Sequence, residues 1–142
     1  MSGHECHVCK ALDNPDPADV VYDDGTWAAY LMAPVPGWIT MAPKEHVEGV
    51  TELPPATAAT LGQTARAIGV ALKAETGADR IHMVYLGEGA RHFHVGFFPR
   101  QAEDQSLFDN GRLLQTMESS SDQAEARRLG AAVREGVATR RS

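Results

Sequence analysis

The segment RHFHVGFFPR (residues 91–100) constrains the fold of this chain more than any other stretch. Side chains of a β-strand alternate between two faces, so three apolar residues share one face and two histidines share the other. The apolar face consists of Phe93, Val95 and Phe97. One apolar and one polar face are typical of an antiparallel sheet that covers a core on one side. We therefore expect a strand over residues 91–98 that ends before Pro99 and presents His92 and His94 away from the core.

The rest of the chain predicts an α+β domain with a mostly antiparallel sheet and one long packed helix. Residues 1–19 carry no periodicity and are expected to be irregular. Apolar segments between turn signals predict further strands at Val20–Tyr22, Thr26–Met32, Trp38–Ala42 and Arg80–Leu86. Apolar residues at helical spacing predict a helix from Pro54-Pro55 to Gly77 and two more at 104–117 and 122–138.

Length and charge narrow the class of protein. With 142 residues, the chain (1–142) is expected to form a single domain. Its net charge of −6 argues against a nucleic-acid partner, which would require a basic surface. We find no apolar run long enough for a membrane span and no secretory signal, so we expect a cytoplasmic protein without a membrane partner.

Both cysteines of the chain, Cys6 and Cys9, belong to one CxxC motif. In a reducing compartment such a pair is more often a metal site or a redox dithiol than a structural disulfide. Histidines at positions 4 and 7 would be competing local ligands, so the motif alone leaves the zinc and redox interpretations open.

An upstream segment completes a pattern that resembles a known family. The apolar stretch Trp38–Ala42 is followed by PKEH (residues 43–46), and the histidine segment ends in Pro99-Arg100. Together with the CxxC motif, these features resemble the histidine triad (HIT) family of nucleotide-binding hydrolases and transferases, in particular its bacterial zinc-containing members. The resemblance covers residues 6–100 and implies a HIT-like fold. Residues 101–142 would form a helical C-terminal extension.

The resemblance implies a catalytic role for His94. Counting back from Pro99-Arg100 aligns His92 and His94 with the first two histidines of the family motif His-x-His-x-His, and Gly96 with the third. The second histidine of the family is a nucleophile that attacks an α-phosphorus and forms a nucleotidyl-histidine intermediate. Glycine has no side chain that can help the leaving group depart, so we expect a cost of about 10²- to 10⁴-fold in rate.

The resemblance also implies a structural zinc ion that pins the N-terminus next to the catalytic strand. Two thiolates and two imidazoles complete a tetrahedral site and leave no coordination position open for catalysis. The four implied ligands are Cys6, Cys9, His46 and His92.

The expected substrate is a small molecule, a purine nucleotide derivative such as a nucleoside phosphoramidate, a dinucleoside polyphosphate or an adenylylated metabolite. The residues that would contact it differ from those of the family, and Tyr30, Glu88 and Arg91 are the candidates. Two alternatives remain. One is a repurposed enzyme in which His94 acts as an acid or base on a non-nucleotide substrate. The other is a catalytically weak nucleotide- or ligand-binding protein. By analogy with the family, we expect a homodimer.

Overall fold

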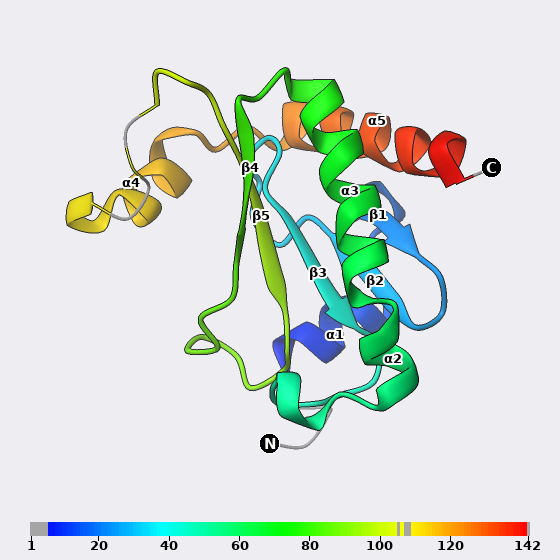
Figure 1. Ribbon diagram of the computed structural model, residues 1–142. Coiled ribbons are helices and arrows are strands. Elements are labelled where there is room, and N and C mark those ends of the chain that lie inside the picture. Colours follow the sequence, from blue (N-terminus) through cyan, green and yellow to red (C-terminus); the bar gives the residue numbers. More distant parts are fainter. Residues whose placement is uncertain (1–5, 105, 107–108, 142) are drawn as a thin grey trace.

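The computed structural model describes residues 6–104, 106 and 109–141 and confirms the predicted α+β fold (Figure 1). Five antiparallel strands form one sheet in the order β1-β2-β3-β5-β4. The strands are β1 (Val20–Asp23), β2 (Trp27–Tyr30), β3 (Ile39–Pro43), β4 (Arg80–Val84) and β5 (Val95–Arg100). The α-helices are α1 (His7–Asp13), α2 (Pro55–Ala59), α3 (Leu61–Thr76), α4 (Arg112–Ser119) and α5 (Gln123–Arg141). Single 3₁₀ turns occupy Pro17–Asp19, Val50–Glu52 and Asp109–Gly111.

One face of the sheet carries the main core, and the long helix α3 covers it (Figure 1). The buried side chains of α3 include Ile68 and Leu72, and those of the central strands include Met41 and Phe97. Helix α5 contacts both α3 and β1, and its Val133 belongs to the same core cluster. The C-terminal helix is therefore built into the fold rather than appended to it.

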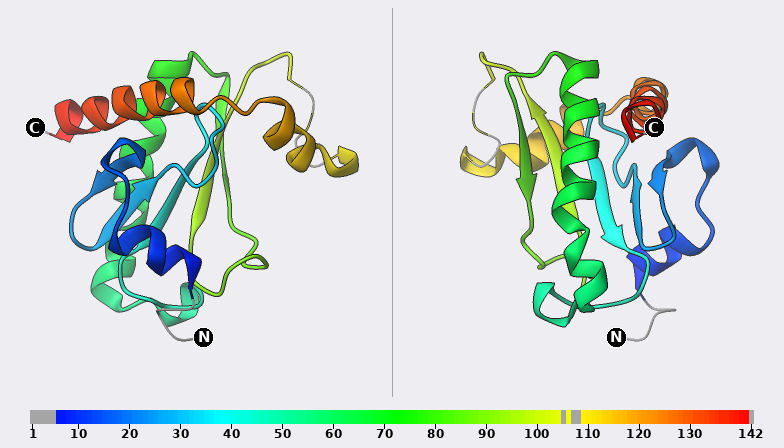
Figure 2. Two further views of the ribbon diagram at one scale, coloured as in Figure 1. Left: turned by 180° about the vertical axis from the view of Figure 1, so that it is seen from behind. Right: turned by 45° about the vertical axis from the view of Figure 1, so that its right-hand side comes forward.

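The opposite face of the sheet holds the residues of functional interest. Helix α1 lies on this face, as the view from behind shows (Figure 2). Because alternate residues of a strand change sides, Thr40 of β3 and Gly96 of β5 lie away from the core. These two residues are direct cross-strand partners. The sheet thus separates the core from a site built on its other surface.

The expectation of an irregular N-terminus is wrong for residues 7–13, which form α1. The Sγ atom of Cys6 caps this helix by accepting a hydrogen bond from the backbone N–H of Cys9. Val8 is fully buried and anchors the helix. The helix is short, and its cap is a thiol rather than one of the usual capping residues. Its start therefore could not be predicted from the local sequence.

The histidine strand starts later and ends later than expected. Strand β5 begins at Val95, because the backbone before it leaves the sheet and the N–H of Phe93 donates to the carbonyl of Val47 at 2.7 Å. The strand continues through Pro99, which pairs with Ile81 of β4. Pairing with β3 ends at Phe97, so the missing N–H of the proline costs no ladder hydrogen bond there.

The predicted long helix is interrupted at Thr60, where α2 ends and α3 begins. The indole N–H of Trp27 donates to the carbonyl of Thr57 and to the hydroxyl of Thr60, which competes with a continuous helix. Gly77 ends α3 in the left-handed conformation, as its sequence position predicted.

The first of the two tail helices is shorter than predicted. Helix α4 starts at Arg112, whereas the carboxylate of Asp104 accepts from the backbone N–H of Gln101 in a turn. Residues 105 and 107–108 of the predicted helix lie outside the described part of the chain. Within the described part, no helix is both long and apolar enough to span a membrane.

Candidate functional site

Four potential metal ligands from three separate parts of the chain meet at one end of the sheet. Their ligand atoms all lie within 4.8 Å of one another, and they are Cys6, Cys9, His46 and His92. The cysteines come from the start of α1, His46 follows β3, and His92 precedes β5. Both cysteines are free thiols and not a disulfide. The structure therefore brings together the four residues that the resemblance implied.

Three of the distances between these atoms are close to those of a tetrahedral zinc site. The Sγ of Cys9 lies 3.2 Å from Nδ1 of His46 and 3.3 Å from Nδ1 of His92, and the Sγ of Cys6 lies 3.6 Å from Nδ1 of His92. Tetrahedral zinc with Zn–S and Zn–N bonds of about 2.3 and 2.0 Å requires ligand atoms roughly 3.3 to 3.8 Å apart. Two thiolates would also balance the charge of Zn²⁺ in this buried position.

The hydrogen bonds of His92 prepare its ring for a metal. Its Nε2 lies 2.8 Å from the carbonyl oxygen of Pro43. A carbonyl can only accept, so Nε2 carries the proton and Nδ1 turns its lone pair toward the cysteines. Burial lowers the pKa of His92, which keeps the ring neutral. The buried Nε2 of His46, by contrast, has no hydrogen-bond partner among the described residues.

Without a metal the thiol of Cys9 is protonated. Burial and then the hydrogen bond with Cys6 raise the pKa of Cys9 to about 11. A bound cation would displace the proton of this thiol and compensate for the burial of the sulfur atoms. The donor set, its burial and the anchored ring of His92 thus fit a closed structural zinc site.

His94 lies two residues from this cluster and holds its imidazole in a defined orientation. Its Nδ1 is 2.7 Å from the main-chain carbonyl oxygen of His92. The same argument assigns the proton to Nδ1 and leaves a lone pair on Nε2. The two histidines are therefore fixed in opposite senses, with Nδ1 of His92 free for a metal and Nε2 of His94 free for chemistry.

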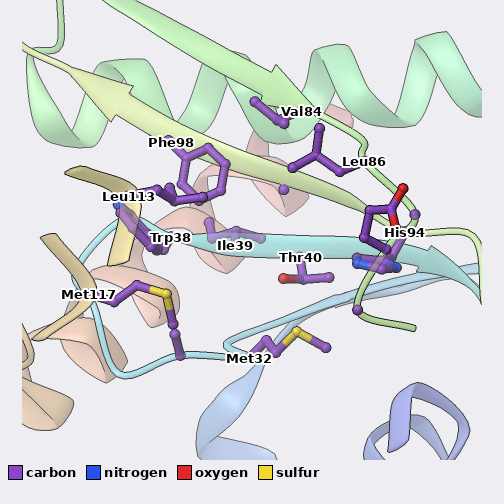
Figure 3. Close-up of a pocket in the computed structure, with 15 residues that line it drawn as sticks. Met32, Trp38, Ile39, Thr40, Val84, Leu86, His94, Phe98, Leu113 and Met117 are labelled. Atoms are coloured by element: carbon purple, nitrogen blue, oxygen red, sulfur yellow. The ribbon is translucent and has the colours of Figure 1, made fainter. Parts of the chain in front are cut away.

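A pocket with a volume of about 280 Å³ opens beside His94 (Figure 3). It lies on the face of the sheet opposite the core, and its floor includes Thr40 and Gly96. Leu113 and Met117 of α4 also line it, so the C-terminal segment takes part in the pocket. Sequence reasoning missed these two residues, because they lie outside the recognisable family motifs.

The aromatic ring of Phe98 lies over Gly96. A Cβ atom at Gly96 would approach Cζ of this ring to 2.8 Å and Cε2 to 3.1 Å. Phe98 in turn makes an edge contact with Trp38, with ring centroids 4.6 Å apart at an interplanar angle of 76°. The space above Gly96 is thus occupied by an aromatic pair.

The three candidate substrate-binding residues lie in different places. Glu88 lines the pocket beside His94. Arg91 does not line it, and pairs instead with Glu48 at 3.0 Å on the surface. The buried hydroxyl of Tyr30 has no hydrogen-bond partner among the described residues. Burial, and then the nearby thiols of the metal cluster, raise the pKa of Tyr30.

Of the two histidines that could compete as ligands, the structure describes His7, which does not belong to the metal cluster. His7 instead lines a second pocket together with Tyr30. Position 4 lies outside the described residues.

Comparison with known proteins identifies the fold. No protein-family model and no curated protein matches the sequence. A Zn-bound histidine triad family protein from Mycobacterium smegmatis matches with a TM-score of 0.73 and 23% identity, over 98% of this chain and 99% of that chain. A hypothetical histidine triad nucleotide-binding protein from Sulfolobus tokodaii strain 7 matches with a TM-score of 0.73 and 22% identity, over 94% and 93%. A histidine triad protein from Sinorhizobium meliloti 1021 matches with a TM-score of 0.68 and 25% identity, over 83% and 88%. The chain therefore has the histidine triad fold, with a buried Cys₂His₂ cluster suited to structural zinc.

Proposed function

We propose that the chain is a zinc-stabilised member of the histidine triad family that hydrolyses or transfers nucleotidyl groups through His94. The observation that carries this proposal is the hydrogen bond of 2.7 Å from Nδ1 of His94 to the carbonyl oxygen of His92. It leaves the lone pair of Nε2 available beside a pocket that His94 itself lines. A neutral, oriented imidazole of this kind is a competent nucleophile near pH 7.

The reaction proceeds in two steps. Nε2 of His94 attacks the α-phosphorus, and the bond from phosphorus to the leaving group breaks as that group departs with the electron pair and takes a proton from water. The positive charge that forms on the ring is stabilised by the hydrogen bond to the carbonyl of His92. A water or another acceptor then attacks phosphorus, releases the nucleotide product and returns His94 to its neutral form.

The zinc site would act on the reaction indirectly, by fixing the position of the segment that orients His94. When bound, zinc would neutralise the thiolates and hold the start of α1 against the sheet, with all four coordination positions filled. The side chain of His92 belongs to the metal cluster, while its main-chain carbonyl orients His94. A fixed metal site therefore stabilises the position of the acceptor that sets the tautomer of the nucleophile.

We infer a purine nucleotide derivative as the substrate, on the basis of the family resemblance. One observation favours the alternative of a non-nucleotide substrate with His94 as acid or base. None of the described residues that line the pocket is a lysine or arginine, and Glu88 is acidic. The nearby Arg91 is engaged with Glu48. A phosphate in this pocket would therefore depend on main-chain N–H groups and on Thr40.

We also propose that the chain forms a homodimer in the cytoplasm, where its cysteines remain reduced. Strand β4 is an edge strand, and an exposed edge with apolar side chains is a typical pairing surface. Met83 on this strand is 55% exposed and does not line the pocket beside His94. Burial of Met83 in a two-fold interface would remove this apolar surface from water.

The test is intact-protein mass spectrometry after brief exposure of the zinc-loaded protein to adenosine 5′-phosphoramidate and to diadenosine tetraphosphate. We expect a nucleotidyl adduct, or nucleotide release in a parallel turnover assay, that the substitution His94→Ala abolishes. His82→Ala is a matched control, because His82 is a half-buried histidine of β4 that does not line the pocket.

The outcomes separate the candidate functions. An adduct or turnover that depends on His94 supports nucleotidyl transfer. Tight binding of the nucleotide without adduct or turnover supports a binding protein. If the nucleotides neither bind nor react, the proposal fails, and the non-nucleotide alternative takes its place.

A further inference from the structure

The pocket beside His94 is apolar along most of its surface. Nine of the fifteen lining residues have apolar side chains and three are glycines, which leaves Thr40, Glu88 and His94 as the polar side chains. Three of the apolar residues also rank among the exposed large hydrophobic side chains of the described chain, namely Met32 (41%), Leu86 (66%) and Met117 (37%). Apolar side chains that stay exposed around one concave site indicate a ligand that covers them.

The pocket extends from the reactive imidazole toward helix α4. Figure 3 shows His94 at one end and Leu113 and Met117 at the other, with Thr40 and Phe98 between them. Any group that extends from an atom bonded by His94 along this groove passes from polar to apolar surroundings. The shape therefore favours an elongated substrate with its reacting centre at one end.

An aromatic ring fills the space above Gly96 in the middle of the groove. Thr40 and Gly96 face the pocket as cross-strand partners, and the ring of Phe98 covers the space above Gly96. The edge contact with Trp38 holds that ring in place. Gly96 therefore leaves room for the edge of the Phe98 ring, which a larger side chain would displace.

We propose that this pocket selects substrates that carry an extended apolar group, such as an alkyl chain, on the leaving atom of the phosphorus attacked by His94. This inference rests on the proposed function and specifies its substrate class. Attack by Nε2 of His94 breaks the bond from phosphorus to the leaving nitrogen. The alkylamine leaves with the bonding electron pair and a proton from water, and a second water releases the nucleotide. The pocket volume of about 280 Å³ is close to the smallest volumes of ligand pockets, so the pocket suits a slender group such as an alkyl chain.

The experiment compares adenosine 5′-phosphoramidates that differ only in their amine, ethylamine or octylamine, on the zinc-loaded protein. The six additional methylenes would lie on apolar surface, so we expect kcat/KM to be about 100-fold higher for the octyl compound. Complete burial of the six methylenes would give a larger ratio of the two kcat/KM values. The pocket is open to solvent on one side, so we expect the octyl chain to stay partly exposed.

A charged residue at the far end of the groove should remove this preference. Leu113→Lys is expected to lower the octyl-to-ethyl ratio at least about tenfold. Gln115→Lys is the matched control, since Gln115 lies on the same helix, is exposed and does not line the pocket. Met117→Lys at the exposed rim is a second variant with the same expected direction, in case Leu113→Lys does not fold.

A binding measurement separates this inference from the proposed function. Ethyl- and octylphosphonate are titrated calorimetrically into the same proteins, and the octyl compound is expected to bind at least about tenfold more tightly. Absence of turnover with retained octyl preference would refute the proposed function alone. Equal affinity for both phosphonates, or equal effects of Leu113→Lys and Gln115→Lys, would overturn the inference about the pocket.

Discussion

The contact between Gly96 and Phe98 predicts an unusual response to the substitution Gly96→Ala. An alanine in the interior of a strand is normally more stable than a glycine by about 0.5–1 kcal/mol, because glycine loses more backbone entropy on folding. Gly96 lies in β5 without a positive φ, so the backbone accommodates alanine. The new methyl group, however, would lie 2.8 Å from Cζ of Phe98.

The expected loss of stability follows from the contacts that the Phe98 ring would lose. Displacement of Phe98 disturbs its edge contact with Trp38, which is worth about 0.5–1.5 kcal/mol beyond area burial. Overpacking a fitted site typically costs about 1–3 kcal/mol. After subtraction of the backbone gain, we expect Gly96→Ala to lower the free energy of unfolding by about 1–2 kcal/mol. For a chain of 142 residues this corresponds to a fall in Tm of roughly 3–8 °C.

The assay is a double-mutant cycle on thermal unfolding, followed by circular dichroism at one fixed zinc concentration. Leucine lacks the Cε and Cζ atoms that would meet the new methyl group, so Gly96→Ala should be neutral or stabilising in the Phe98→Leu background. Gly69→Ala in α3 is the control, because a Cβ atom there has no neighbour within 4 Å and should stabilise the helix. If Gly96→Ala changes Tm equally in both backgrounds, the ring does not restrict this position.

Three further predictions concern the metal site and the oligomer. Cys9→Ser removes one of four ligands, so bound zinc measured by mass spectrometry should fall below about a tenth of the native content. Limited proteolysis should also cleave α1 faster. A zinc content equal to that of the native protein would contradict the assignment of Cys9 as a ligand. Because burial lowers the pKa of His92 below its unfolded value of about 6.5, the unfolded metal-free chain binds more protons, and stability is lost as the pH falls below about 6.5. Urea unfolding at pH 7.5 and 5.5 should show this loss, and the His92→Asn variant should show less of it. Met83→Arg should convert the proposed dimer to a folded monomer in light-scattering chromatography, and an unchanged mass would exclude β4 as the interface.

Much of the local structure could be predicted because it depends on short-range periodicity. The alternation of Phe93, Val95 and Phe97 identified the core face of the segment that contains β5, and all three side chains are buried. Leu61 and Leu72 at helical spacing identified α3, and Gly77 marked its end. The four metal ligands could be predicted only through the family resemblance, because the CxxC motif by itself left the zinc and redox interpretations open.

The exact strand boundaries could not be predicted, because they depend on contacts between distant segments. His92 and His94 were expected within a strand, yet the chain reaches the sheet only at Val95. Before that point the backbone is held by the carbonyl of Val47 and the ring of His92 by the carbonyl of Pro43. Val47 and Pro43 are both distant in sequence from this segment, so no local pattern predicts where the chain leaves the sheet.

The sequence by itself determined which residues can do chemistry, whereas the tertiary structure decided where they act. Cys6 and His92 are 86 positions apart and meet only because α1 packs against the end of the sheet. Strand alternation places Gly96 and Phe98 on one face of β5, but no spacing rule links them to Leu113 of α4, which lines the groove beside them. Donor atoms are a property of residue type, but a pocket exists only when side chains from separate elements surround the same volume. Burial then excludes water from it, and that exclusion is a property of the packed fold alone.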